Sequence, residues 1–134
     1  MKPENRIQWL RRVLFVKVVL TLFAWGLPAL LGPMALLAVL KLPIPADPIY
    51  LRLFGGACTA FGVAYWFAYR DPVRNVAIIQ AGLVDNGLIT LVILFLGLTG
   101  RVTSAFLALS GLLTGLFFLL FLLLMPRPER PATR

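Results

Sequence analysis

The chain has 134 residues, of which 60% are hydrophobic and only 13% are charged, and it contains no histidine. A soluble domain is about 45–50% apolar and about 25% charged, so this composition excludes a soluble monomer. The length allows a single domain. The 13 basic and 5 acidic residues give a net charge of +8, whose meaning depends on where the charges lie.

Apart from Asp85, four long stretches carry no charge: Val18–Leu40, Leu53–Tyr69, Asn75–Gly100 and Val102–Pro126. A helix that crosses a bilayer needs about 20 mostly apolar residues. The sequence therefore predicts an all-α integral membrane four-helix bundle. We expect one domain over residues 1–126, with spans at about 12–31, 50–69, 75–98 and 104–125. Residues 127–134 are expected to form a disordered basic tail.

Prolines mark the predicted breaks and starts of the helices. Pro28 and Pro33 lack a backbone N–H, so we expect them to break the first helix and to leave a short interfacial helix at 33–40. Asp47-Pro48 and Asp71-Pro72 each combine an N-cap residue with a first-turn proline, which predicts a helix start at each.

Basic residues are distributed unevenly between the two predicted sides of the membrane. Three of them, Lys41, Arg52 and Arg101, fall on one side. Nine fall on the side of the termini: Lys2, Arg6, Arg11, Arg12, Arg70, Arg74, Arg127, Arg130 and Arg134. Because cytoplasmic loops are rich in Lys and Arg, both termini are predicted to be cytoplasmic. The same charge favours anionic lipids as bilayer partners. Tyr65, Trp66 and Tyr69 are expected in the aromatic belt at the inner interface.

The absent residues exclude several chemistries. Without histidine there is no bis-histidine haem, imidazole zinc site or histidine base. The single cysteine, Cys58, forms neither an internal disulfide nor a CxxC centre. The short loops leave no room for a nucleic-acid-binding domain. We therefore predict no cofactor, no metal, no nucleic-acid partner and no enzymatic activity.

Asp85 is predicted to lie near the middle of the membrane, where a carboxylate costs a few kcal/mol. It must therefore face other helices. Lys17 is the other charge expected inside the hydrocarbon, and its depth allows it to approach Asp85. We predict one buried polar cluster of Lys17, Thr21, Asp85, Asn86, Thr90 and Thr114. This cluster either stabilises helix packing through hydrogen bonds between helices or forms a site for a ligand, an ion or a proton.

Small residues recur at helical spacing on two predicted helices. Gly56, Ala60 and Ala64 follow one another every four residues, and Gly111 with Gly115 forms a GxxxG motif. Such stripes let membrane helices approach closely. They are expected to serve packing within the bundle, with a homo-oligomer interface as the alternative.

The order of the Gly- and Pro-containing motifs along the chain resembles that in small four-helix bacterial inner-membrane proteins that are loosely DoxX-like. The resembling segments are Gly26-Leu-Pro28 with Gly32-Pro33, Leu42-Pro-x-Pro-Ala-Asp-Pro48 and Tyr69-Arg-Asp-Pro-x-Arg-Asn75. The resemblance implies a multi-pass protein of the bacterial inner (cell) membrane and carries over no catalytic residue. Some DoxX-like proteins are partners of quinone-linked oxidoreductases. The lack of histidine and of a cysteine pair argues against a direct redox role here.

Two functions follow as hypotheses. The first is a non-enzymatic membrane protein, either free-standing or an accessory subunit that binds a larger membrane complex. The alternative is a small proton-coupled transporter or a binder of lipophilic ligands that uses the Asp85 cluster. The first predicts a stoichiometric protein partner, and the second predicts ligand binding that depends on Asp85.

Overall fold

The computed structural model describes residues 3–102 and 104–126, and the regular elements in those ranges are all helical. Thr103 and the predicted tail 127–134 lie outside the described residues. The elements in chain order are α1 (Pro3–Leu20), the π-helix η1 (Thr21–Gly26), α2 (Leu27–Leu31), α3 (Ala35–Val39), α4 (Ile49–Arg70), α5 (Val76–Leu98) and α6 (Ala105–Leu124).

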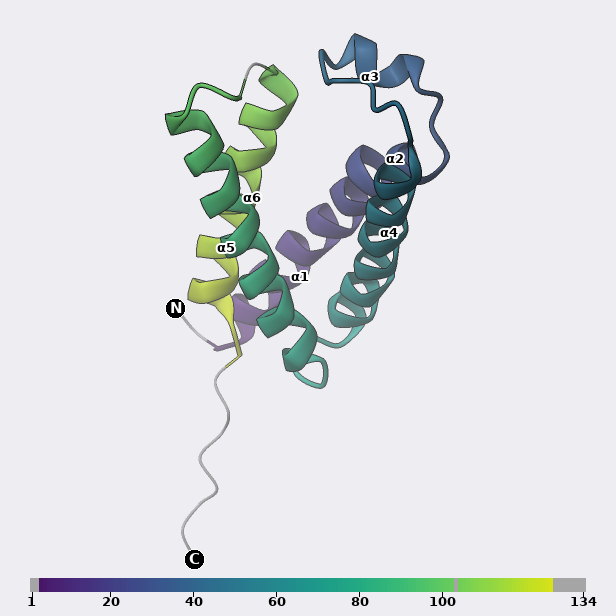
Figure 1. Ribbon diagram of the computed structural model, residues 1–134. Helices are drawn as coiled ribbons and strands as arrows, with labels where there is room; N and C mark the ends of the chain where they lie inside the picture. The colour runs from purple at the N-terminus through teal and green to yellow at the C-terminus, as the bar shows by residue number, and fades with distance from the viewer. Residues whose placement is uncertain (1–2, 103, 127–134) are drawn as a thin grey trace, which may run out of the picture.

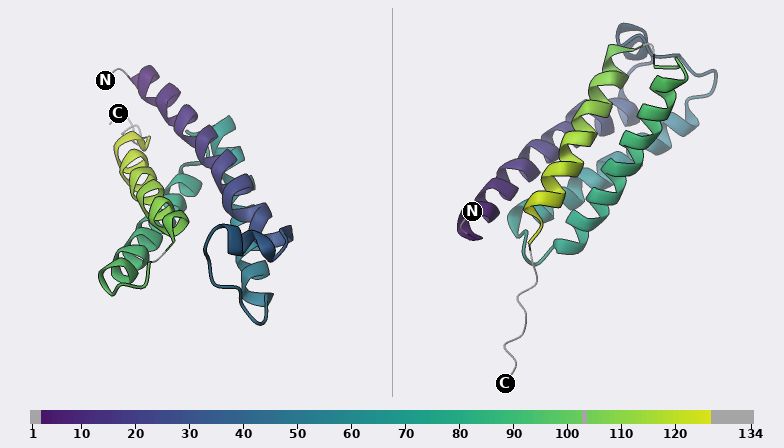
Figure 2. Two further views of the ribbon diagram at one scale, coloured as in Figure 1. Left: turned by 90° about the horizontal axis from the view of Figure 1, so that it is seen from above. Right: turned by 90° about the vertical axis from the view of Figure 1, so that its left-hand side faces the viewer.

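The long helices form two pairs (Figures 1 and 2). The continuous rod α1–η1–α2 packs along α4, and α5 packs along α6. The pairs meet at the end that holds the start of α1 and the end of α6, and they diverge toward α3 (Figure 1). A hydrogen bond of 2.8 Å from Arg6 Nη2 to the Leu123 carbonyl joins those two helix ends.

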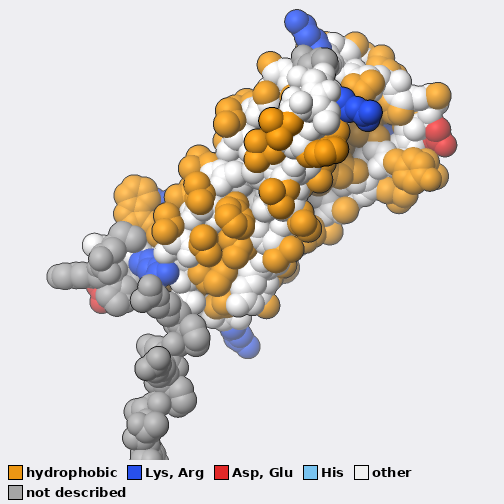
Figure 3. Space-filling model, turned by 60° about the vertical axis from the view of Figure 1, so that its left-hand side comes forward, with side chains coloured by type: hydrophobic (Ala, Val, Ile, Leu, Met, Phe, Trp, Pro, Cys, Tyr) orange, Lys and Arg blue, Asp and Glu red, His pale blue; other side chains and the backbone are white. Residues whose placement is uncertain are grey.

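Three helical stretches are long and apolar enough to cross a membrane: Glu4–Leu31, Val76–Leu98 and Ala105–Leu124. The 22-residue α4 is less apolar, because it carries Arg52, several glycines and several tyrosines. Leu98 is 87% exposed and Leu112 is 73% exposed. In Figure 3 hydrophobic side chains cover the middle of one face, and Lys and Arg lie toward its two ends. A soluble protein rarely exposes so large an apolar area, so the surface suits a bilayer.

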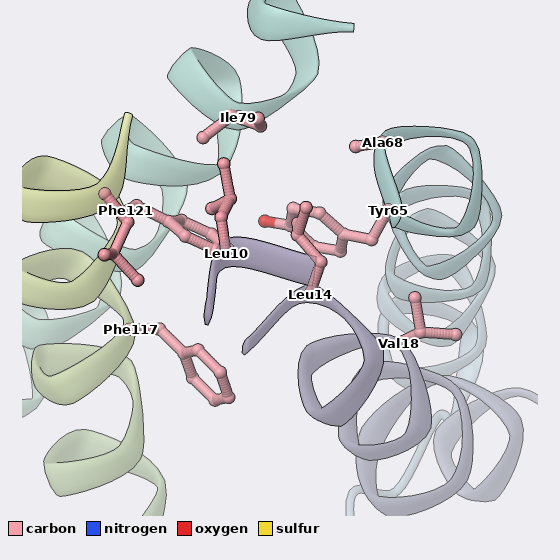
Figure 4. Packing of buried hydrophobic residues seen from close by; sticks show 9 residues of the cluster. Leu10, Leu14, Val18, Tyr65, Ala68, Ile79, Phe117 and Phe121 are labelled. Atoms are coloured by element: carbon pink, nitrogen blue, oxygen red, sulfur yellow. The ribbon is translucent and has the colours of Figure 1, made fainter. Parts of the chain in front are cut away.

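The hydrophobic core fills the end where the pairs meet (Figure 4). The aromatic rings of Tyr65 and Phe121 lie 6.0 Å apart between their centroids, in a tilted geometry. Apolar side chains from all four long helical stretches surround them: Leu10, Leu14, Val18, Ala68, Ile79, Phe117 and Leu124. This cluster holds the two pairs together at one end.

Pro28 does not break the first helix, so that prediction is wrong. Pro28 lies in the first turn of α2, and the preceding segment adopts a π-helix in which the Leu27 N–H bonds to the Leu22 carbonyl. The wider turn accommodates the missing donor of Pro28, so the rod continues to Leu31. The break comes at Gly32–Met34, and the short helix that follows covers Ala35–Val39 instead of 33–40.

Arginine side chains satisfy carbonyls at the ends of neighbouring helices. Arg52 donates through Nη1 to the Ala29 carbonyl at 3.1 Å and through Nη2 to the Gly32 carbonyl at 2.8 Å, which caps the end of α2. Arg6 does the same for α6 through Leu123. The last carbonyls of a helix have no partner within it and carry partial negative charge, so a guanidinium is well suited to them.

Glycines set how closely the helices approach. A Cβ on Gly55 would lie 2.6 Å from the Ala29 carbonyl carbon and would also overlap the Leu30 backbone nitrogen, so α4 touches the α2 backbone there. The close contact therefore runs through Gly55 and not through the predicted stripe. Gly56 would meet only the Leu30 side chain, at 4.0 Å. Ala60 is exposed and Ala64 is half-buried.

The GxxxG motif of α6 packs against α5. A Cβ on Gly111 would lie 2.6 Å from Cγ2 of Ile93, and one on Gly115 would lie 3.5 Å from Cγ2 of Thr90. Ile93 and Thr90 both belong to α5, so these two glycines serve packing inside the chain. The structure thus gives α6 the close approach that the spacing of its glycines indicates.

Gly55→Ala is expected to lower the free energy of unfolding by about 1–3 kcal/mol, because a methyl group overlaps backbone that cannot swing away. Unfolding of the purified protein by SDS in mixed micelles, followed by circular dichroism, measures the change. Gly56→Ala is the matched control, since its methyl group has space. That variant should be neutral or more stable by up to about 1 kcal/mol from helix propensity. Equal losses in both variants would contradict the packing assignment.

Candidate functional site

Lys17 lies in the last turn of α1 and is only 4% exposed. Its Nζ donates a hydrogen bond of 2.7 Å to Oδ1 of Asn86 on α5. The same nitrogen lies 4.8 Å from the ring centroid of Phe117, 5.5 Å from that of Tyr65 and 5.8 Å from that of Trp25. A cation within about 6 Å of an aromatic ring is attracted by the ring's quadrupole. One amide oxygen and three rings therefore replace the water that the ammonium loses.

Asn86 is fully buried, and its side chain is bonded on both sides. Nδ2 donates to the Gly82 carbonyl at 2.6 Å and lies 3.5 Å from the Tyr65 hydroxyl. Gly82 makes this arrangement possible, because a Cβ there would lie 2.6 Å from the Tyr65 hydroxyl oxygen. The amide is thereby oriented with its oxygen toward Lys17.

A second set of polar contacts continues from Asn86 along α5 to α6. The Thr90 hydroxyl oxygen lies 2.7 Å from the Asn86 carbonyl and 3.0 Å from the hydroxyl oxygen of Thr114. Lys17, Asn86, Thr90 and Thr114 thus form one connected chain of hydrogen-bonding groups. It links α1 to α5 and α5 to α6, as the cluster predicted from the sequence requires.

The remaining two predicted members, Thr21 and Asp85, are placed differently. The Thr21 hydroxyl is buried and has no hydrogen-bond partner within the described ranges. Asp85 is half-buried, and its polar neighbours are the Lys17 ammonium and the Tyr65 hydroxyl. Both residues line a cavity between the helix pairs. The Thr21 hydroxyl oxygen is itself buried, whereas the half-buried Asp85 can offer its carboxylate to a ligand.

The cavity has a volume of about 650 Å³ and lies where the two helix pairs diverge. Ligand sites for small molecules span about 300–1,000 Å³ and combine apolar walls with a few polar groups. The lining is mainly apolar and includes Pro28, Leu37, Phe54, Ile89 and Phe106. Its hydrophilic members are Lys17, Thr21, Asp85, Ser110 and Thr114. This composition fits a lipophilic molecule with one polar end.

Three aromatic residues of the site were not predicted from the sequence. Tyr65 is fully buried beside Lys17, so its assignment to the interfacial aromatic belt is wrong. Trp25 belongs to η1, lines the cavity and donates through Nε1 to the Ser110 hydroxyl at 3.1 Å. Phe117 gives the shortest ring contact to Lys17. Aromatic residues in apolar helices are common, so their spacing alone carried no signal for these roles.

The site shows no arrangement for metal binding. No group of three or more His, Cys, Asp or Glu side chains lies close enough to hold a metal ion in residues 3–102 and 104–126. The polar groups of the cavity can instead orient a ligand through hydrogen bonds and charge.

Comparisons with known proteins return no relative. No protein-family model, no curated protein and no solved structure matches this chain. The resemblance to the DoxX-like group therefore stays a prediction.

The Lys17–Asn86 bond is expected to show a coupling of about 1–2 kcal/mol in a double-mutant cycle. Lys17→Met and Asn86→Leu each leave a buried polar group without its partner, whereas the double variant removes both groups. The double variant should therefore be more stable than the sum of the single losses predicts. SDS unfolding in mixed micelles measures each free energy.

Thr99→Val combined with Lys17→Met is the control cycle, because the exposed Thr99 hydroxyl bonds only within its own helix. Its two changes should add within about 0.5 kcal/mol. Full additivity in the Lys17 and Asn86 cycle as well would show that the bond contributes no specific stability.

Proposed function

We propose that this chain is a multi-pass membrane protein that binds a lipophilic ligand in the cavity between its two helix pairs. The observation that carries the proposal is the cavity of about 650 Å³, whose mainly apolar wall also contains Lys17 and Asp85. The cavity is partly open at the surface, and it has the size and the apolar wall that are typical of small-molecule sites. The charged pair in this wall provides groups that a ligand's polar end can bind.

The proposed membrane arrangement has four crossings, with α4 as the fourth. Arg52 supports this assignment, because its guanidinium bonds to the Ala29 and Gly32 carbonyls and so does not face lipid uncompensated. The glycines of α4 lower its hydropathy but pack it against α2. The distribution of Lys and Arg favours cytoplasmic termini, and the DoxX-like resemblance favours the bacterial inner membrane.

The proposed role is non-enzymatic binding, which includes the hypothesis of a small transporter. An accessory subunit of a larger membrane complex is the second candidate. A groove of about 620 Å³ on the surface of α5 and α6 supports it, because its apolar lining includes the exposed side chains of Leu94, Leu98 and Leu112. Gly97 in the same lining would let a partner helix approach closely. Stoichiometric co-purification of another membrane protein in mild detergent would favour this second candidate.

Fluorescence of Trp25 tests the binding proposal, because this residue lines the cavity. The protein carries Trp9→Phe and Trp66→Phe, is reconstituted in nanodiscs, and is titrated with undecanol that carries a bromine on carbon 2, next to the hydroxyl head, which quenches a nearby tryptophan. We expect quenching of Trp25 to saturate. In the matched protein that keeps only Trp66, which is 42% exposed on the surface of α4, quenching should follow the bilayer concentration of the probe without saturating.

A cavity-filling variant controls for specificity. Ala57→Phe places a ring in the cavity, whereas Ala60→Phe adds the same ring one turn along α4 at an exposed position outside the cavity lining. Ala57→Phe should abolish the saturating component and Ala60→Phe should retain it. If Trp25 and Trp66 are quenched in parallel at every probe concentration, the cavity holds only bulk lipid and the binding proposal is wrong.

A further inference from the structure

The charges that line the cavity restrict the ligands that it accepts. In the part of the chain that the structure describes, Lys17 and Asp85 are the only charged residues of the lining. Their charges cancel whether both groups are ionised or a proton has passed from the ammonium to the carboxylate. The remainder of the lining is uncharged. A ligand that brought a net charge would therefore add an uncompensated charge to an apolar space, which is costly.

The two charged groups also differ in how fully they are satisfied. Lys17 is 4% exposed, bonds to Asn86 and is surrounded by three rings. Asp85 is half-buried and has the Tyr65 hydroxyl beside it as a donor, which leaves the other lone pairs of its carboxylate free. Thr21 is 6% exposed, and its hydroxyl oxygen is buried and unpaired within the described ranges. The group left for a ligand is thus the carboxylate of Asp85, which accepts hydrogen bonds.

We infer that the cavity selects an uncharged amphiphile, whose hydroxyl-type head bonds to Asp85 and whose alkyl or ring body lies against the apolar wall. A hydroxyl supplies a donor for the free lone pairs of the Asp85 carboxylate. It leaves the balance between Lys17 and Asp85 undisturbed. This inference rests on the proposed function and adds the chemical class of the ligand.

The test compares three probes with the same brominated undecyl chain: an alcohol, a sulfate and a trimethylammonium. The protein retains Trp25 as its only tryptophan and is studied in nanodiscs, and the Trp66-only protein corrects for the partition of each probe into the bilayer. We expect the alcohol to bind the native cavity about 10-fold or more tightly than either charged probe. Equal binding of the three heads would overturn the inference.

Single substitutions at Lys17 or Asp85 should change which probe head group the cavity binds most tightly. Asp85→Asn keeps the shape of the side chain but leaves Lys17 uncompensated, so the sulfate should improve about 10-fold relative to the alcohol. Lys17→Met leaves Asp85 uncompensated, so the trimethylammonium should improve instead. The double variant Lys17→Met/Asp85→Asn restores a neutral cavity and should again prefer the alcohol. It also controls for effects of each substitution on folding.

The outcomes separate the two proposals. If no probe gives saturable quenching of Trp25 in any variant, the proposed function itself fails. If probes bind saturably but either single variant keeps the native order of heads, the cavity binds lipophilic molecules without selection by charge balance, and only this inference fails. A reversal of preference in opposite directions in the two single variants supports it.

Discussion

A buried lysine controls the arrangement of this molecule. An ammonium in the middle of an apolar helix costs about 3 kcal/mol on insertion scales, and the chain tolerates Lys17 only because other elements surround it. Asn86 comes from α5, Phe117 from α6, Tyr65 from α4 and Trp25 from η1. Every long helical stretch thus contributes to one cation. Its bond to Asn86 also joins the two helix pairs where the hydrophobic core ends.

Along the length of the helices, Lys17 lies at the boundary between two parts of the molecule. On one side of it the space between the helix pairs is filled by the core, and on the other side that space forms the cavity. The core surrounds Lys17 with Tyr65 and Phe117 and extends toward the end where the pairs meet through Leu10 on α1 and Phe121 on α6. Beyond Lys17 the rod and α4 present small residues to the cavity: Ala24, Ala29, Gly32 and Ala57. At one end aromatic rings fill the space between the pairs. At the other end small side chains share the cavity wall with the rings of Trp25, Phe54 and Phe106. The π-helix η1 lies in the open half, and such segments often occur at functional sites.

The divergence of the pairs is held by contacts within each pair. Gly55 brings α4 onto the α2 backbone, and Arg52 caps the carbonyls of α2 at the next turn. Gly111 and Gly115 hold α6 close to α5. Because each pair is tightly packed by itself, the space between the pairs does not need to collapse. A bilayer adds no hydrophobic force that would close it, since lipid chains are as apolar as the cavity wall.

The amino-acid sequence was enough to predict the helical class, the apolar stretches, and the membership of Lys17, Asn86, Thr90 and Thr114 in one polar cluster. These features depend on local spacing and on the cost of polar groups in an apolar stretch, which are visible in one dimension. The tertiary structure alone decided that Tyr65 faces Lys17, that Gly55 makes the close contact on α4, and that the helix continues through Pro28. The packing of the helices also places Asp85 at a cavity, beside the Tyr65 hydroxyl. These features depend on how helices that are distant in the sequence are rotated about their axes and cross one another. Because the helix surfaces are almost uniformly apolar, the sequence pattern does not specify that rotation, and only the packing of side chains sets it.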